Sequence, residues 1–200
     1  MTAVKVSRSA VFLAASIAAI AIILLLLMLP GEKGGPQAIT YNGFEFTNVD
    51  GLWRTAWERD GQPYELDFRF NPAEVADIPV EGKTDVRFQH QSVFITFDPS
   101  ENKTSETSYV ALAAVEISRK LVDPFERDVI AACTKNETQA CASRPIITCD
   151  STDSSVIYLK QHDEAKIILE GNCVTLQGRN NDLVRAADRA LFEWLGIMRE

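Results

Sequence analysis

The sequence predicts an α+β fold in which an N-terminal transmembrane helix precedes one extracytoplasmic domain with a mixed, largely antiparallel sheet and packed helices. Three patterns predict it: an uncharged apolar run, a segment that alternates apolar and charged side chains, and a segment with apolar side chains at helical spacing. The expected parts are a cytoplasmic N-terminus at 1–9, a transmembrane helix at 10–29, a linker at 30–38 and the extracytoplasmic domain at 39–200.

The apolar run AVFLAASIAAIAIILLLLML is long enough to cross about 30 Å of hydrocarbon as a helix. A secretory signal peptide would have a shorter core of about 7–15 residues and a small-residue cleavage site. A pilin-like signal would continue the helix into the head, whereas Pro30 and Gly31 stop it at once. The run therefore favours an uncleaved signal anchor with a single span.

Charge around the run predicts its orientation. Lys5 and Arg8 precede it, and the nearest following cation, Lys33, stands beside Glu32, so the N-terminus is expected in the cytoplasm and the rest outside. All 28 acidic residues follow the run, with 18 of the 20 basic ones. Such an acidic surface repels phosphate backbones, which argues against a nucleic-acid partner and leaves the membrane and another envelope protein or surface component.

The first half of the domain is expected to begin with antiparallel strands. In YELDFRF, from Tyr64 to Phe70, every second residue is apolar, and LWRTAWE places Trp53 and Trp57 on one face. The intervening RDGQP predicts a hairpin turn. Residues 71–91 are rich in Pro, Gly and charge and predict irregular structure.

Parallel strands joined by helices are expected next. SVFITFD, from Ser92 to Asp98, predicts a strand covered on both faces, and residues 107–122 predict a helix. Asp123 as N-cap, Pro124 and Glu126 predict a second helix running toward the first cysteine.

The remainder predicts a polar loop, CTKNETQAC, then the strands PIITC, SVIYLK, AKIILE and NCVTLQ, and a closing helix from about Asn181. All the strands are expected in one mixed sheet.

Four cysteines outside the cytoplasm predict two disulfides. We expect Cys133–Cys141 across the polar loop and Cys149–Cys173 between strands, one of three possible pairings. No CxxC motif indicates a redox dithiol or a zinc ribbon, and no cofactor is expected. Two glycosylation sequons, at Asn102 and Asn136, fit an exterior location.

The stretches VFITFDPS, GNCVTLQG and LVRAADRALFEWLGIM resemble a group of uncharacterised single-pass archaeal membrane proteins over about the C-terminal half. That resemblance implies an archaeal surface location and no particular activity.

A second resemblance is local. IITCD resembles the strand that carries the sortase cysteine, and sortases are also anchored by an N-terminal helix. It implies that Cys149 is a nucleophile in a transpeptidase or hydrolase and that His90 is its acid or base. The family's arginine on the following strand has no counterpart in SVIYLK.

A third possibility is a divalent-metal or small-ligand site. Asp98 and Asp150 end two strands expected to run parallel, and ligands collect at the carboxyl ends of such strands. The alternative reading is that both aspartates start turns. Because no familiar catalytic motif occurs, the leading hypothesis is a non-enzymatic binding or structural envelope protein.

Overall fold

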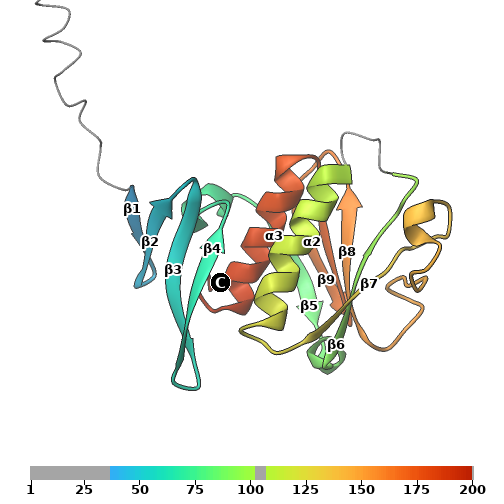
Figure 1. Cartoon of the computed structure of the whole chain (residues 1–200), viewed down its shortest axis with the longest axis horizontal. Helices are drawn as coiled ribbons and strands as arrows, with labels where there is room; N and C mark the ends of the chain where they lie inside the picture. Colours follow the sequence, from blue (N-terminus) through green and yellow to red (C-terminus); the bar gives the residue numbers. More distant parts are fainter. Residues whose placement is uncertain (1–36, 102–106, 200) are drawn as a thin grey trace, which may run out of the picture. The chain divides into compact units, whose positions relative to one another are not determined.

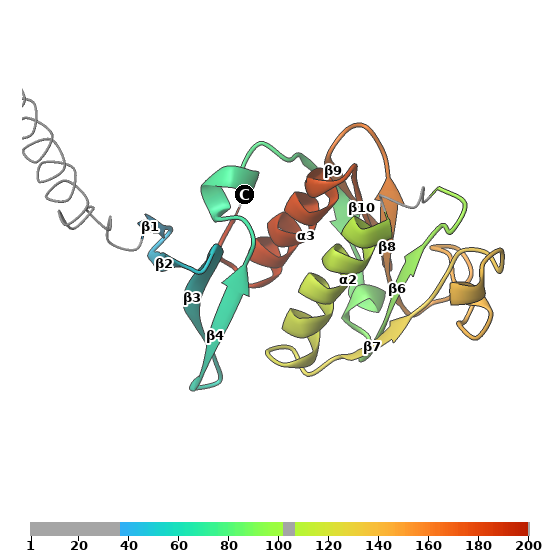
Figure 2. The same ribbon diagram turned by 45° about the horizontal axis from the view of Figure 1, so that its top comes forward.

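The computed structural model describes residues 37–101 and 107–199, which belong to one compact unit. They form three layers: a four-stranded sheet, a pair of helices and a six-stranded sheet (Figures 1 and 2). The α+β class is confirmed, although the strands form two sheets rather than one. The predicted anchor at 10–29, Asn102 and nearly all of the predicted linker lie outside the described residues. Neither helix of the described residues is long and apolar enough to span a bilayer.

The first sheet is an antiparallel meander of neighbouring strands. Its strands are β1 (Ala38–Tyr41), β2 (Phe44–Val49), β3 (Leu52–Arg59) and β4 (Gln62–Phe68). The predicted hairpin is confirmed, because β3 pairs with β4 and Trp57 lies opposite Tyr64. Asp60 and Gly61 both have positive φ, 52° and 78°, as a two-residue type I′ turn requires. Trp53 is buried on the inner face.

The second sheet is mixed but mainly parallel. Its spatial order is β5 (Val80–Thr84), β9 (Lys166–Gly171), β10 (Cys173–Gly178), β8 (Ser155–Gln161), β6 (Ser92–Phe97) and β7 (Asp128–Ala131). Only β9 and β10 pair antiparallel. The expectation of a largely antiparallel sheet therefore holds for the meander and is wrong for this sheet. Here a helix connects β6 to β7, so the two strands run in the same direction.

Two α-helices separate the sheets. Helix α2 (Thr107–Val122) confirms the predicted helix, and α3 (Asn181–Trp194) confirms the closing one. Helix α3 is buried on most sides because it packs on both sheets. The ring of Phe192 lies 5.7 Å from that of Phe46 and 4.5 Å from that of Phe68. One continuous hydrophobic core therefore runs through all three layers.

Residues 71–91 are more ordered than expected. They contain the 3₁₀ helices η1 (Pro72–Val75) and η2 (Val86–Gln89) around strand β5. Asn71 caps η1 by accepting hydrogen bonds from two backbone N–H groups, and Glu74 completes a capping box. Strand β5 carries one apolar residue, Val80, in an otherwise polar segment. The polar composition gave no apolar pattern from which β5 could be predicted, because an edge strand buries few side chains.

The predicted second helix after α2 is wrong. Glu126 has φ of 53°, in the left-handed region, and the chain enters strand β7 instead. At these residues, contacts with distant parts of the chain outweigh the local sequence signal for a helix N-terminus. The Phe125 ring lies 5.7 Å from that of Trp57, and the Arg127 side chain donates to backbone carbonyls near the start of β6.

The predicted strand at 145–149 is also wrong. The segment makes one isolated bridge, between Cys133 and Ile146, and otherwise crosses the sheet on the face opposite the helices. There the hydroxyl of Thr96 donates to the carbonyl of Ile147 at 2.9 Å. The crossover from β6 therefore contains one helix and ends in β7, not at residue 145.

The two disulfides are those expected. Cys133 is bonded to Cys141 around the polar loop, which includes the short 3₁₀ helix η3 (Gln139–Cys141). Cys149 is bonded to Cys173 at the start of β10. The second bond fastens the crossing segment to the sheet.

Candidate functional site

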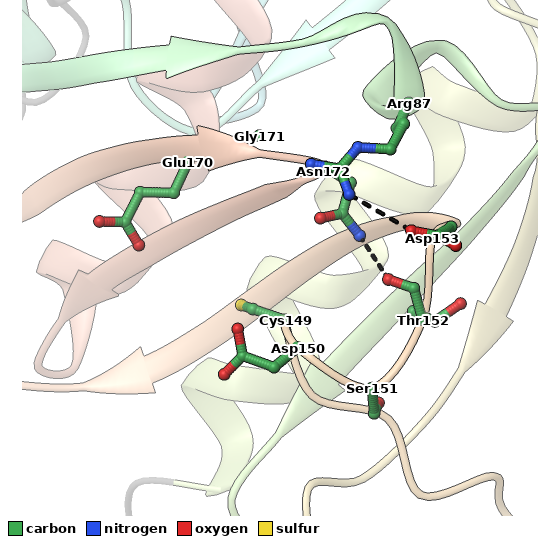
Figure 3. A pocket seen from close by; sticks show the side chains of 9 residues that line it. All are labelled: Arg87, Cys149, Asp150, Ser151, Thr152, Asp153, Glu170, Gly171 and Asn172. Carbon is green, nitrogen blue, oxygen red and sulfur yellow. Dashed lines mark hydrogen bonds and ion pairs between the residues drawn. The ribbon is translucent and has the colours of Figure 1, made fainter.

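A polar hollow of about 540 Å³ opens where β8 and β10 begin. Arg87 from η2 lies on one side, residues 149–153 on another, and residues 170–172 of the β9–β10 connection complete it (Figure 3). It contains Cys149 and Asp150, two residues that the sequence singled out.

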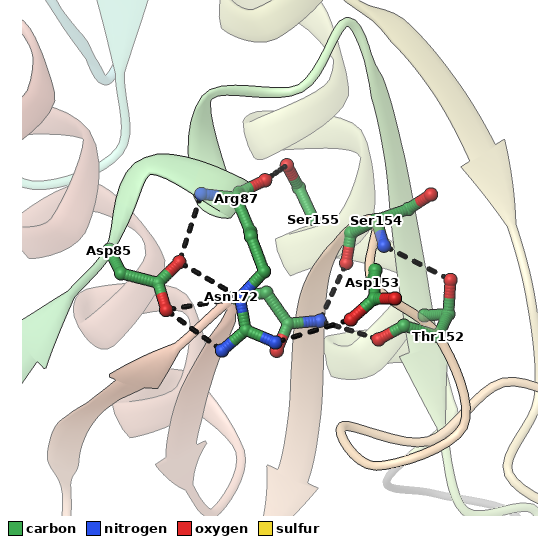
Figure 4. Close-up of polar contacts among 7 residues, drawn as sticks. All are labelled: Asp85, Arg87, Thr152, Asp153, Ser154, Ser155 and Asn172. Carbon is green, nitrogen blue, oxygen red and sulfur yellow. Dashed lines mark hydrogen bonds and ion pairs between the residues drawn. The ribbon is translucent and has the colours of Figure 1, made fainter.

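Backbone contacts position this hollow. Asp85 precedes η2 and caps it by accepting from the N–H of Arg87 at 2.9 Å, while the Asp85 N–H donates to the carbonyl of Gly171 at 2.8 Å. Asn172 is buried and its side-chain amide donates to the carbonyls of Thr152 and Ser154, both at 2.8 Å (Figure 4). These contacts hold η2 and the loop before β8 against the β9–β10 connection.

Arg87 pairs with two carboxylates at the hollow. The guanidinium of Arg87 lies 2.8 Å from one oxygen of Asp85 and 3.3 Å from Asp153 (Figure 4). Its hydrogen bond holds the pKa of Asp85 below the ordinary value. The carboxylates of Glu170 and Asp150 add further negative charge to the lining of the hollow. The hollow can therefore accept ammonium groups or hydroxyl donors, but it lacks an activated nucleophile.

The disulfide decides the role of Cys149 in this structure. All four cysteines are bonded, so Cys149 has no thiol to act as the nucleophile that the sortase resemblance implies. His90 follows η2 as an exposed residue and lines neither of the two hollows to which Cys149 contributes. The two residues are therefore not brought together as a catalytic pair.

Asp98 and Asp150 do line one hollow, of about 340 Å³, on the open face of the large sheet. Asp98 accepts from Ser100 through the N–H at 2.9 Å and the hydroxyl at 2.6 Å, and it pairs with Lys135 at 2.9 Å. Burial raises the pKa of Asp98, but these hydrogen bonds outweigh burial and hold the pKa below the ordinary value.

Lys135 therefore stands where a cation would bind. The described residues contain no group of three or more His, Cys, Asp or Glu side chains placed to hold a metal ion. Asp98 behaves as the turn-starting aspartate of the alternative reading.

A third feature was missed from the sequence: the outer edge of β7. Strand β7 ends the six-stranded sheet and pairs only with β6 among the described strands. The N–H groups of Asp128 and Ala132 donate toward β6, at 3.0 and 2.8 Å. Because neighbouring residues of a strand alternate, the backbone N–H and C=O of Val129 and Ala131 point outward. Within the described residues nothing bonds to them.

The open part of this edge has a defined end. At Cys133, the next residue that faces outward, the N–H donates to Pro145 at 3.1 Å and the carbonyl accepts from Ile147 at 2.9 Å. The chain thus covers its own edge there and leaves it uncovered at Val129 and Ala131.

An apolar groove of about 340 Å³ lies beside the open edge, between β7 and α2. Small side chains, Ala111 and Ala114, form its helical wall, and Val129 and Ala131 form its strand wall. The exposed apolar surface continues along α2 to Val115, which is 47% exposed.

One cation lies at the groove. Arg144 is exposed, its guanidinium lies 5.9 Å from the centre of the Phe97 ring, and no carboxylate of the described residues pairs with it. The sequence signal for the groove was the small-residue stripe on the helix, which also suits a core face.

No family model, curated protein or solved structure matches this chain.

Proposed function

We propose that the chain is a membrane-anchored, non-enzymatic binding protein whose extracytoplasmic domain holds an extended segment of another envelope protein along β7. The observation that carries the proposal is the open backbone edge at Val129 and Ala131 beside an apolar groove. Exposed backbone donors and acceptors pair with an extended peptide, and adjacent pockets select its alternate side chains.

The groove favours a partner segment with apolar residues at alternate positions. An added strand would place every second side chain over Ala111 and Ala114, in the layer that Val129 and Ala131 occupy on β7. Small wall residues leave room for a larger apolar side chain. Arg144 favours an acidic residue or a terminal carboxylate near that end of the groove.

Two further observations support the location. Both disulfides lie in the domain, as is typical of oxidising compartments. The uncharged run at 10–29, with Lys5 and Arg8 before it, suits an anchor with a cytoplasmic N-terminus.

The test uses the full chain in lipid nanodiscs as bait for a displayed library of random linear peptides. Ala131→Pro removes an outward N–H and adds a ring on the open side, while the inward hydrogen bonds of β7 stay intact. Ala111→Glu places a charge in the groove, and Ala76→Glu makes the same change at an exposed alanine after η1.

We expect enriched peptides with alternating apolar residues that lose at least about tenfold in affinity for the Ala131→Pro and Ala111→Glu variants. Their affinity for the Ala76→Glu variant should be unchanged. Peptides that bind all three variants equally, or no enrichment, would refute the proposal. A dimer of the chain that Ala131→Pro dissociates would also refute it, because a second copy would then occupy the edge.

A further inference from the structure

Another hollow, of about 520 Å³, combines aromatic walls with two arginines. Phe88, Phe125 and Trp194 supply the aromatic rings, and Arg59 and Arg127 supply the charge. They come from η2, the turn after α2, the end of α3, the end of β3 and the approach to β7. None of the residues that line it is acidic, in a chain with a net charge of −8.

Two of the aromatic rings pack against each other. The Phe88 ring lies 5.6 Å from that of Trp194. The Arg127 guanidinium lies 5.4 Å from the centre of the Phe88 ring, and that of Arg59 lies 5.8 Å from the centre of the Phe125 ring. Each cation is therefore held over a ring face at the hollow, as in cation–π pairs.

Arg127 is the unusual member of the cluster. It is half-buried, and burial lowers its pKa. Its Nη2 donates to the Phe88 carbonyl at 2.8 Å and to the Ser155 hydroxyl at 2.7 Å, and it also contacts the His90 carbonyl. No carboxylate of the described part of the chain pairs with it. Removing a charge from water without a counter-ion costs free energy, which a bound anion would recover.

Arg59 is only weakly neutralised. Its Nε lies 3.5 Å from a carboxylate oxygen of Asp60, which is 89% exposed, and its Nη1 donates to the carbonyl of Pro124 at 2.8 Å. A surface pair at that distance contributes little. Arg59 can therefore give charge-assisted hydrogen bonds to a ligand, and Arg127 adds a positive charge that no carboxylate of the described residues neutralises.

We propose that this hollow binds a small aromatic anion, with its ring against Phe88 and Trp194 and its carboxylate or sulfonate between Arg59 and Arg127. The volume is in the range of ligand sites, about 300–1,000 Å³. The site is separate from the β7 edge, so either proposal can fail alone.

The test compares 2-naphthoate with its neutral analogue of nearly the same shape, 2-naphthamide. Each is titrated into the full chain in lipid nanodiscs by calorimetry, and empty nanodiscs give the blank for partitioning into lipid. Arg59→Gln removes one cation with one backbone contact, whereas Arg127 also anchors η2 and its loss could unfold the site. Arg54→Gln is the matched control, since Arg54 pairs with Asp67 on the meander and lines none of this hollow.

We expect naphthoate to bind at least about tenfold more tightly than naphthamide, and Arg59→Gln to weaken naphthoate about tenfold, with Arg54→Gln unchanged. Equal affinity for the two ligands would overturn the anion assignment, and so would no binding. Equal weakening by the two variants would overturn the location, because general charge rather than this hollow would then attract the ligand.

Discussion

Replacing Asp188 by asparagine will remove a pH dependence from the stability of the domain. Asp188 lies on α3 and is fully buried, and one carboxylate oxygen accepts from the backbone N–H of Arg69 at 3.0 Å and of Phe70 at 2.9 Å. The other oxygen has no partner among the described atoms. Glu116 and Lys120 of α2, themselves paired at 2.7 Å, are the charged side chains that act on it.

The magnitude follows from the pKa. Burial raises the pKa of Asp188 from 3.8 to about 7; Lys120 and the two N–H donors oppose this rise, and Glu116 adds to it. One pH unit of displacement corresponds to about 1.4 kcal/mol, so ionisation in the folded protein costs about 4 kcal/mol. Because the folded state binds this proton more tightly, the stability that Asp188 contributes is greatest below about pH 4 and is lost as the pH rises through about 7.

Urea unfolding of the disulfide-bonded full chain, followed by tryptophan fluorescence between about pH 4 and about pH 8, measures this effect. Asparagine keeps an acceptor for the two N–H groups but buries an unpaired amide, which costs about 1–3 kcal/mol at every pH. The free energy of unfolding of the Asp188→Asn variant, relative to wild type, should therefore rise by several kcal/mol across the range. A difference that stays constant would refute the reasoning.

Asp77→Asn is the control with the opposite sign. Asp77 is exposed, and the hydrogen bond from Arg185 holds its pKa below the ordinary value. Its stabilising contribution is present above the unfolded-state pKa and is lost as the pH falls. The deficit of the Asp77→Asn variant should therefore grow, slightly, as the pH rises.

Three shorter predictions concern stability. Replacing both Cys149 and Cys173 by serine should lower the free energy of unfolding by about 3 kcal/mol in chemical denaturation, because the bond closes a loop with a sequence separation of 24. Gly178→Ala should lower it by about 1–3 kcal/mol, since a Cβ there would lie 2.6 Å from the backbone of Asp182; an unchanged midpoint would contradict that crowding. Phe192→Ala should cost about 3–5 kcal/mol, measured by thermal unfolding, as it removes the ring that packs α3 against Phe46 and Phe68 of the meander.

The spacing of apolar residues correctly predicted the strands and helices that have a defined buried face. The alternation around Tyr64 and the helical stripe of residues 107–122 gave correct elements, because burial follows the period of the backbone there. It failed where tertiary contacts decide the structure. Phe125 and Arg127 hold the chain in a turn although the local signal favours a helix. Residues 146–148 are β-branched, yet their segment crosses the sheet instead of forming a strand.

The candidate sites were less predictable than the fold. Asp98 and Asp150 line one hollow, but the reason inferred from the sequence is wrong, because residue 150 does not end a strand. Arg59 and Arg127 lie far apart in the chain, and nothing local relates them; only the packing of the meander beside α2 places both at one hollow. The open edge of β7 could not be predicted, because the order of the strands in the sheet decides which strand lies at an edge.

The position of α3 has a consequence for how the protein is made. This helix separates the two sheets and supplies core to both, yet it follows all ten described strands in the sequence. A nascent chain that has exposed every strand still lacks the helix whose side chains join both sheets in one core. Both sheets therefore complete their native packing only after α3 has emerged, and until then part of their apolar faces stays exposed to aggregation.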